Sequence, residues 1–310
     1  MKWMSYRSPS DRTERIGILV GEQVLGCSQA DRLLDLFGDD GSRLAEAGEQ
    51  CLARPRETLA LPEIHVNAPI PVPPSFRDFM AFEDHIVPIL RARGATVDPA
   101  WYQIPAFYFT NPAATQGPTD PVKAAPEATD LDFELEIAAV VGRPGRNISP
   151  AEAEANIVGY MLLSDWSARD LQRRERGIGL GPVKGKDWAS SFGPVFVTAD
   201  EFEPYRKGNG FDIGMRADVN GRPYSSGNLS DLYWSFGEMI SYASRGTEVR
   251  AGDVIGSGTV GTGCIADLSA RHGIDRYPWL VPGDTIRLEA DLLGAIDVAL
   301  VPSDPISALR

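Results

Sequence analysis

The sequence predicts an α+β fold in two parts, a small N-terminal α+β module and a larger strand-rich body. Two observations carry this prediction. Segments with strand patterns follow one another with short helical segments between them, unlike the regular strand–helix alternation of a doubly wound sheet. Residues 61–74 carry four prolines in their last six positions and are typical of a stiff extended linker. We therefore predict domains at 1–70 and 71–310.

The N-terminal module is predicted to contain one hairpin and two short helices. Residues 16–20 and 23–26 have strand patterns, and Gly21-Glu22 lies between them near the turn. Residues 31–37 and 42–52 have the patterns of short helices. These elements would form a unit before the proline-rich segment.

The body is predicted to alternate strands with short helices and loops. Ser149 and Pro150 are typical of an N-cap and the first position of a helix, and Asn220-Gly221 predicts a hairpin turn. The other predicted elements are a loop entering a helix over 76–93, an extended segment over 105–112, a buried strand over 158–165, a helix or tight turn over 166–174, strands over 195–198, 211–219 and 286–288, and an amphipathic helix over 232–244.

Composition and charge exclude several classes of function. The formal net charge is −13 and no run is rich in lysine and arginine, so nucleic acid and anionic membranes are poor partners. The N-terminus lacks an apolar signal core, and no apolar run reaches the roughly 18 residues of a membrane helix. The three cysteines have no metal-binding or disulfide spacing, which fits reduced thiols and a cytoplasmic location.

The segment 130–142 is the most informative part of the sequence. It reads as a strand in which Glu134 and Glu136 share one face, while Phe133, Leu135 and Ile137 share the other. Because the carboxylate face continues with apolar residues, the two glutamates are expected to point into a pocket. Buried carboxylates need a cation or a shared proton.

Asp165 ends a second apolar strand, and with the two glutamates it would form a hard oxygen site for Mg²⁺, Mn²⁺ or Ca²⁺. The alternative is surface charge on two edge strands. Arg169 and Gln172 would lie along the same rim on the following helical turn. Arg169 could bind a carboxylate in a bidentate manner, or it could pair with Asp170 or Glu175.

Two glycine-rich loops and one histidine complete the candidate residues. Residues 179–194 present Lys184 and Lys186, and residues 256–263 present Thr259, which could donate to a ligand carboxylate. Tight turns are the alternative for both loops. Asp78 and His85 are seven residues apart and would share one side of a helix. His85 lies beside acids that could raise its basicity, as a general base requires.

Taken together, these residues resemble the fumarylacetoacetate hydrolase family over about residues 70–310. The resemblance rests on three motifs in the family's order, namely Leu-Asp-Phe-Glu-Leu-Glu, Ser-Asp-Trp-Ser-Ala-Arg-Asp-Leu-Gln and Gly-Ser-Gly-Thr. It implies a β-rich mixed-sheet roll, a homodimer, and a divalent metal held by Asp78, Glu134, Glu136 and Asp165.

The resemblance also implies roles for the remaining candidates. His85 would be the catalytic histidine and Lys186 the loop lysine, and the substrate contacts would be Tyr108, Arg169, Gln172 and Thr259. The chain departs from the family at two positions. Met80 stands where the animal enzyme has tyrosine, and Asp267 replaces the glutamate that pairs with the histidine. Aspartate keeps the charge but is one methylene shorter, and a water-activating pair is sensitive to such a displacement.

The expected function is metal-dependent hydrolysis of a carbon–carbon bond in a β-diketone or acylpyruvate-type oxo-acid. Mg²⁺ is the first expectation for the metal, with Mn²⁺ or Ca²⁺ as alternatives. His85, oriented by Asp267, would take a proton from water, and Lys186 would stabilise the oxyanion. Isomerases, decarboxylases and hydratases in the same family share a metal-stabilised enolate and remain alternatives. A noncatalytic metal-binding protein is the alternative from a different class.

Overall fold

The computed structural model describes residues 1–308 and confirms the α+β prediction. Its main sheet has twelve strands. The path runs through β4 (Thr58–Ala60), β3 (Gln23–Gly26), β2 (Glu14–Val20), β1 (Lys2–Arg7), β15 (Ser190–Thr198), β13 (Ile157–Asp165), β11 (Leu135–Val141), β21 (Val254–Gly256), β6 (Phe76–Phe79) and β7 (Phe107–Phe109). Off this path, β5 (His65–Asn67) pairs with β1 and β8 (Thr115–Gln116) pairs with β15.

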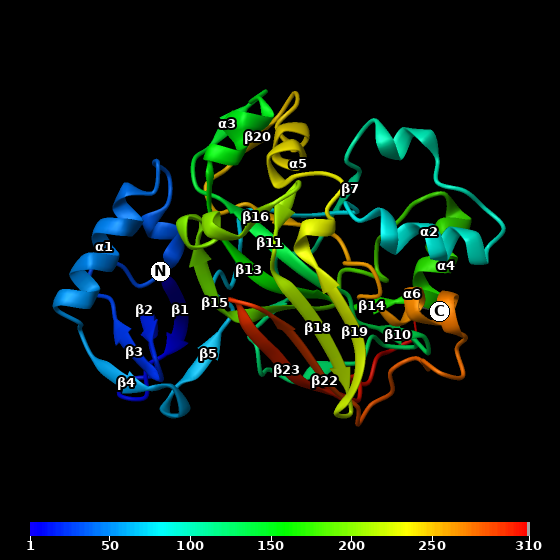
Figure 1. Cartoon of the computed structure of the whole chain (residues 1–310). Helices are drawn as coiled ribbons and strands as arrows, with labels where there is room; N and C mark the ends of the chain where they lie inside the picture. Colours follow the sequence, from blue (N-terminus) through cyan, green and yellow to red (C-terminus); the bar gives the residue numbers. More distant parts are fainter. Residues whose placement is uncertain (309–310) are drawn as a thin grey trace.

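A second, five-stranded sheet packs against the middle of the main sheet (Figure 1). Its order is β19 (Arg222–Asn228), β18 (Gly214–Val219), β22 (Thr285–Ala290), β23 (Gly294–Val301) and β9 (Val122–Lys123). Most neighbouring strands are antiparallel, but β21 pairs with β6, β23 with β9 and β15 with β8 in parallel. Three two-stranded pairs complete the strands: β10 (Leu131–Asp132) with β14 (Ser167–Ala168), β12 (Gly145–Arg146) with β20 (Glu248–Val249), and β16 (Arg206–Lys207) with β17 (Gly210–Phe211).

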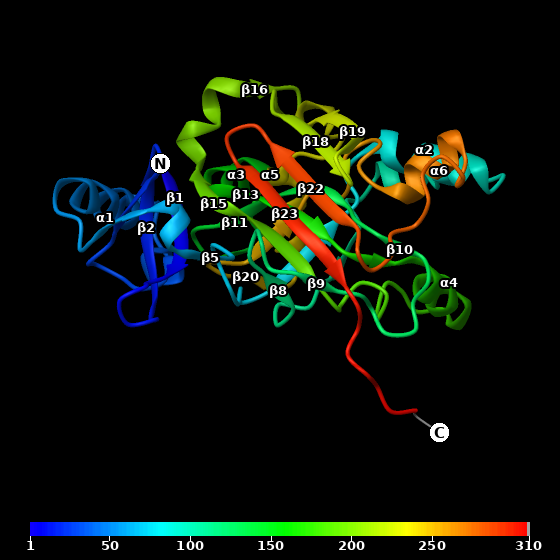
Figure 2. The same cartoon turned by 90° about the horizontal axis from the view of Figure 1, so that it is seen from below.

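The helices are short and lie around these sheets. α2 (Glu83–Ala92) packs against α6 (Ile265–His272), and α3 (Pro150–Ala155) packs against α5 (Phe236–Ala243). α1 (Ser42–Ala53) lies in the N-terminal module at one end of the molecule, whereas α2, α4 (Arg169–Ile178) and α6 gather at the other end (Figures 1 and 2). Short 3₁₀ turns occur at Leu33–Leu36, Leu61–Glu63, Pro99–Tyr102, Ala199–Glu201, Glu203–Tyr205 and Leu229–Asp231.

Two apolar cores lie on opposite faces of the main sheet, and the alternation along β11 separates them. Leu135 and Ile137 join the core shared with the second sheet. Ala138 and Val140 join the core that also holds Leu44 of α1. The predicted division of the 130–142 faces is therefore confirmed, although this segment is not one continuous strand, because β10 ends at Asp132 and β11 begins at Leu135.

Several predicted elements are confirmed in position. The hairpin of β2 and β3 turns at Gly21-Glu22, and the hairpin of β18 and β19 turns at Asn220-Gly221. Ser149 caps α3, with Pro150 in its first turn.

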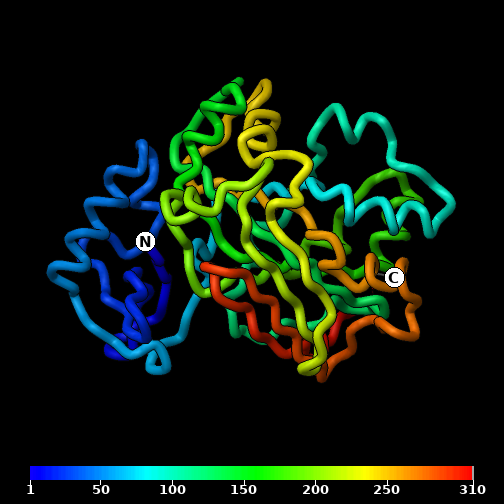
Figure 3. Tube along the Cα trace, viewed as in Figure 1, coloured from blue at the N-terminus to red at the C-terminus, as the bar shows by residue number. Residues whose placement is uncertain are grey.

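Other element predictions were wrong. Residues 31–37 form only a 3₁₀ turn, residues 211–219 are divided between β17 and β18, and the helix predicted over 232–244 begins at Phe236 after its Ser235 cap. Among residues 1–308, none of the helices combines the length and apolar composition needed to cross a bilayer. The boundary at residue 70 stays a prediction. The main sheet runs across it, because β1 pairs with β15. The tube in Figure 3 shows the blue N-terminal trace at one end of the molecule, next to the rest of the chain.

Candidate active site and metal centre

Four acidic side chains from neighbouring strands meet at one point. β13, β11, β21 and β6 follow one another in the main sheet. Asp165 and Glu136 lie on the adjacent strands β13 and β11, and Asp78 lies on β6, one strand beyond β21. Glu134 lies just before β11, and its carbonyl accepts a hydrogen bond from the Asp165 N–H at 3.2 Å. Gly256 makes room for the cluster, because a Cβ there would clash with Asp78 Oδ1.

The structure corrects the predicted local context of Asp78. Residues 76–79 form β6 rather than a loop, and His85 lies in the following helix, α2. Asp78 and His85 therefore do not share one side of a helix. They nevertheless line the same cavity, because β6 leads directly into α2.

The four carboxylates fit a divalent metal ion. One oxygen from each of Asp78, Glu134, Glu136 and Asp165 lies within 4.8 Å of the others, and all four side chains are buried. Asp78 Oδ1 and Asp165 Oδ1 have no hydrogen-bond partner among residues 1–308. Buried oxygens of this kind are costly unless a cation or proton is bound. Hard carboxylate oxygens are the donors that Mg²⁺, Mn²⁺ and Ca²⁺ prefer.

Lys186 and Tyr108 are the closest polar neighbours of this cluster. Lys186 Nζ lies 2.5 Å from Asp165 Oδ2 and also contacts Glu134 Oε2. Tyr108 Oη donates to Asp78 Oδ2 at 2.8 Å and contacts Asp165. The glycine-rich loop therefore places Lys186 in the site, whereas Lys184 is exposed and pairs with Asp187.

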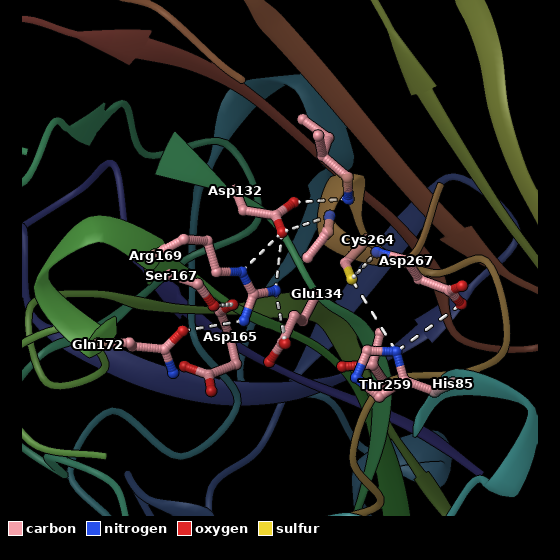
Figure 4. Close-up of polar contacts among 12 residues, drawn as sticks. His85, Asp132, Glu134, Asp165, Ser167, Arg169, Gln172, Thr259, Cys264 and Asp267 are labelled. Carbon is pink, nitrogen blue, oxygen red and sulfur yellow. Dashed lines mark hydrogen bonds and ion pairs between the residues drawn. The ribbon is translucent and has the colours of Figure 1, made fainter. Parts of the chain in front are cut away.

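Arg169 is held by two acids, and neither is Asp170 or Glu175, the partners considered for it from the sequence. Its guanidinium lies 2.7 Å from both Asp132 and Glu134 (Figure 4). It also donates to Gln172 Oε1 at 3.1 Å. Asp132 accepts further hydrogen bonds from the backbone N–H groups of Ile265 and Ala266, so it ties Arg169 to the start of α6. The alternative pairing of Arg169 with Asp170 or Glu175 is wrong.

Thr259 lies beside the cluster, next to Glu136. Its hydroxyl donates to Glu136 Oε1 at 3.4 Å, and the Gly258 N–H donates to Glu136 Oε2 at 3.1 Å. The 256–263 loop thus contacts a predicted metal ligand directly. The substrate contact predicted for Thr259 stays a prediction.

Burial and like charges oppose full ionisation of the cluster. Burial, with the neighbouring Asp78 and Glu134, raises the pKa of Glu136 well above its ordinary value. Burial also raises the pKa of Asp165 to about 8, although Lys186 opposes this shift. Burial opposes ionisation of Glu134 as well, but Lys186 and Arg169 hold its pKa below the ordinary value. The metal-free site should therefore retain protons that a divalent cation would replace.

These pKa shifts predict how the stability of the metal-free protein depends on pH. A carboxyl whose pKa is raised on folding contributes stability below its unfolded pKa, and the contribution is lost as the pH rises through the folded pKa. For Asp165 that loss extends from the ordinary value of 3.8 up to about 8. Thermal unfolding should show the melting temperature falling more steeply from about pH 5 to about pH 8 in the wild type than in Asp165→Asn. If the melting temperature fell equally steeply with pH in both proteins, the raised pKa of Asp165 would be contradicted.

His85 and Asp267 lie close together without forming a hydrogen bond. His85 Nδ1 is 3.8 Å from Asp267 Oδ2. The two Asp267 oxygens accept hydrogen bonds at 2.6 Å from the Arg271 side chain and from the Thr262 N–H. His85 Nδ1 also lies 4.0 Å from Cys264 Sγ. The predicted orienting role of Asp267 therefore stays a prediction, and its carboxylate already has two other partners.

These side chains surround one cavity of about 1100 Å³. His85, Glu134, Glu136, Arg169 and Lys186 line its polar end. The rest of the wall is largely apolar and includes Ile86, Ile89, Leu90, Val97, Trp101 and Ile274. Of the predicted site residues, Asp165 and Asp267 are not in the wall. Asp165 contacts Lys186, and Asp267 lies 3.8 Å from His85; both of these partners line the cavity. A cavity with a charged end and a largely apolar wall suits a small anionic substrate.

Sequence comparison identifies the family. Residues 75–301 match the family model described as Fumarylacetoacetate (FAA) hydrolase C-terminal. The chain belongs to the fumarylacetoacetate hydrolase family. Among curated relatives of this family member, the oxaloacetate tautomerase YisK of Bacillus subtilis is 31% identical over 76% of this chain and 73% of the relative. The mitochondrial oxaloacetate tautomerase of Xenopus laevis is 27% identical over 97% of this chain and 90% of the relative.

Other relatives and solved structures include hydrolases. The fumarylacetoacetase of Arabidopsis thaliana is 27% identical over 63% of this chain and 58% of the relative. The fumarylacetoacetate hydrolase of Exiguobacterium antarcticum has a TM-score of 0.75, with 26% identity over 97% of this chain and 99% of that chain. The maleylpyruvate hydrolase of Sphingobium sp. SYK-6, solved with manganese(II) ion and pyruvate, shares the fold with a TM-score of 0.71 at 22% identity, over 98% of this chain and 100% of that chain.

Proposed function

We propose that this family member is a metal-dependent tautomerase that interconverts the keto and enol forms of a small 2-oxo acid, with oxaloacetate as the first substrate to test. The relationship between His85 and Asp267 carries the choice of reaction. Hydrolysis relies on a histidine that a carboxylate orients so that it can activate water. Here the separation is 3.8 Å, and both carboxylate oxygens have other donors. Tautomerisation needs only a positioned group that moves one proton.

The residues around the cavity supply the parts of this reaction. Asp78, Glu134, Glu136 and Asp165 would hold the metal, with Mg²⁺ as the expected ion and Mn²⁺ or Ca²⁺ as alternatives. When bound, the metal would supply a Lewis acid for the carboxylate and 2-oxo oxygens of the substrate. Lys186 would donate to the oxygen on which negative charge develops.

His85 would transfer the proton. In the keto form it would take a proton from the carbon next to the 2-oxo group. The C–H bonding electrons would then form the carbon–carbon double bond, and the carbonyl electrons would move to oxygen, which takes a proton from a water molecule in the cavity to complete the enol. The protonated His85 would then return its proton to the hydroxide so formed. In the reverse direction His85 would return the proton to carbon. Its side chain is buried and lies at the cavity wall, where a bound substrate could reach it.

Hydrolysis of an acylpyruvate remains the second candidate, because His85 and Asp267 are close enough to pair after a small shift. The two reactions are separated by His85→Asn and Asp267→Asn. Loss of a general acid or base typically lowers the rate about 10²- to 10⁴-fold. For a tautomerase we expect that loss from His85→Asn and less than a tenfold loss from Asp267→Asn, whereas a hydrolase should lose heavily in both variants.

The direct test measures both reactions in the wild-type protein with Mg²⁺, with and without EDTA. The disappearance of enol-oxaloacetate absorbance reports tautomerisation, and pyruvate release from an acylpyruvate reports hydrolysis. Faster metal-dependent turnover of the enol supports the proposal. Faster cleavage of the acylpyruvate overturns it in favour of hydrolysis. No metal-dependent turnover of either substrate would favour a noncatalytic metal-binding protein.

A further inference from the structure

Three buried side chains form a second ligand group beside the carboxylate cluster. His85, Glu134 and Cys264 each offer one donor atom, and these atoms lie within 4.8 Å of one another. The thiol sulfur of Cys264 lies 4.0 Å from His85 Nδ1, and Figure 4 shows the two side chains facing each other. His85 and Glu134 also line the cavity, so an ion could reach this group from there.

This donor set differs from the carboxylate cluster in chemistry. Sulfur and imidazole nitrogen favour Zn²⁺ and similar borderline ions, whereas Mg²⁺ and Ca²⁺ favour oxygen. Three protein ligands with a fourth position open to a cavity are also a common zinc arrangement. The proposed tautomerisation does not use Cys264. The carboxylate of Glu134 belongs to both groups, so an ion at one group affects the other.

We propose that Cys264, His85 and Glu134 form an inhibitory site for Zn²⁺ and other thiophilic divalent ions. An ion bound there takes up a nitrogen of His85 and an oxygen of Glu134. The inhibition rests on the proposed function, in which His85 transfers the proton, but the metal site itself does not. Arg169 and Lys186 both contact Glu134 and weaken the attraction for a cation. Asp132 offsets the charge of Arg169.

Cys264→Ser is a suitable variant because the residue also caps a helix. The sulfur of Cys264 accepts a hydrogen bond from the Asp267 N–H at the start of α6. Serine is among the preferred N-cap residues, so the helix and the fold should be retained. The substitution replaces the thiol with a much weaker zinc ligand. Cys51→Ser is the matched control, because Cys51 is also buried but lies in α1 of the N-terminal module.

The first experiment titrates chelator-treated protein with Co²⁺, which stands in for Zn²⁺ and gives a sulfur-to-cobalt charge-transfer band when a thiolate binds it. We expect the band in the wild type and in Cys51→Ser, and its loss in Cys264→Ser. Absence of the band from the wild type, or its survival in Cys264→Ser, would overturn the site. This readout does not depend on any catalytic activity, so it is independent of whether the proposed function holds.

The second experiment measures Zn²⁺ inhibition of enol-oxaloacetate turnover with Mg²⁺ in excess, with each protein normalised to its own rate without zinc. Loss of the thiolate ligand should raise the inhibition constant at least about tenfold in Cys264→Ser, which corresponds to about 1.4 kcal/mol. Cys51→Ser should match the wild type. Equal inhibition of all three proteins would overturn inhibition through this site, even where the cobalt band is present.

Discussion

Replacing Glu136 with glutamine is expected to weaken Mn²⁺ binding at least about 100-fold, because outer-shell changes alone typically cost 10- to 100-fold. The variant should lose its metal-dependent turnover at subsaturating metal in parallel. Glu136 is fully buried, and burial with the nearby acids raises its pKa. Glutamine resembles the protonated form, so the metal-free fold should be retained while a negative ligand is removed. Manganese titration followed by electron paramagnetic resonance measures the affinity directly.

The control for this change is Glu49→Gln. Glu49 is an exposed glutamate on α1 in the N-terminal module. The Glu49→Gln substitution should leave manganese affinity and turnover unchanged. If Glu136→Gln binds Mn²⁺ as tightly as the wild type does, the four-carboxylate cluster is not the metal site.

Replacing Lys186 with methionine should separate metal affinity from turnover. Lys186 is buried and contacts Glu134 and Asp165. Burial disfavours its charge, but Asp165 and Glu134 keep its pKa above the ordinary value. Without this ammonium group a divalent cation meets less repulsion, so Mn²⁺ affinity should rise. Turnover should fall about 10²- to 10³-fold, as when a donor to a developing oxyanion is removed.

The same substitution should destabilise the metal-free protein, since removal of one partner from a buried ion pair typically costs about 3–5 kcal/mol. Saturating Mn²⁺ should restore much of that loss, because the ion replaces the missing positive charge. Lys184→Met is the control, as Lys184 is two residues away in the same loop and exposed. A Lys186→Met protein with unchanged turnover would remove Lys186 from the proposed reaction. Weakened metal binding would show that the lysine supports the site only structurally.

Local sequence signals predicted many elements because their causes are local. A serine cap followed by proline starts α3 at Pro150, and Asn220-Gly221 adopts the backbone needed for a tight hairpin turn. The alternation along β11 predicted which side chains face each core. This alternation is local, because successive side chains of any strand point to opposite faces of the sheet.

The failures have non-local causes. Residues 76–79 show little strand pattern of their own and form β6 because they pair with β21, far along the chain, and with β7. The break between β10 and β11 depends on β14, which pairs with residues 131–132 separately from the main sheet. Pairing partners distant in sequence cannot be read from a single segment.

The candidate site was predicted best where side-chain chemistry and strand alternation agree. Glu134, Glu136 and Asp165 followed from that agreement, whereas Asp78 was assigned as a metal ligand only through the family resemblance. Asp132 was missed, although it shares the alternation of Glu134 and Glu136, and this pattern could have indicated it as the partner of Arg169. Cys264 was missed because nothing near it in sequence is a metal ligand. His85 comes close to it only through the packing of α2 against α6.

The continuous main sheet has a consequence for how the chain can be divided. β1 pairs with β15, so the N-terminal module protects the backbone of a strand in the catalytic body. A fragment beginning after the proline-rich segment would expose that part of β15 as an open edge, which invites pairing between molecules and aggregation. The module should therefore unfold together with the body, and the shortest well-behaved protein includes it. A change of composition along the chain need not coincide with a unit that folds alone.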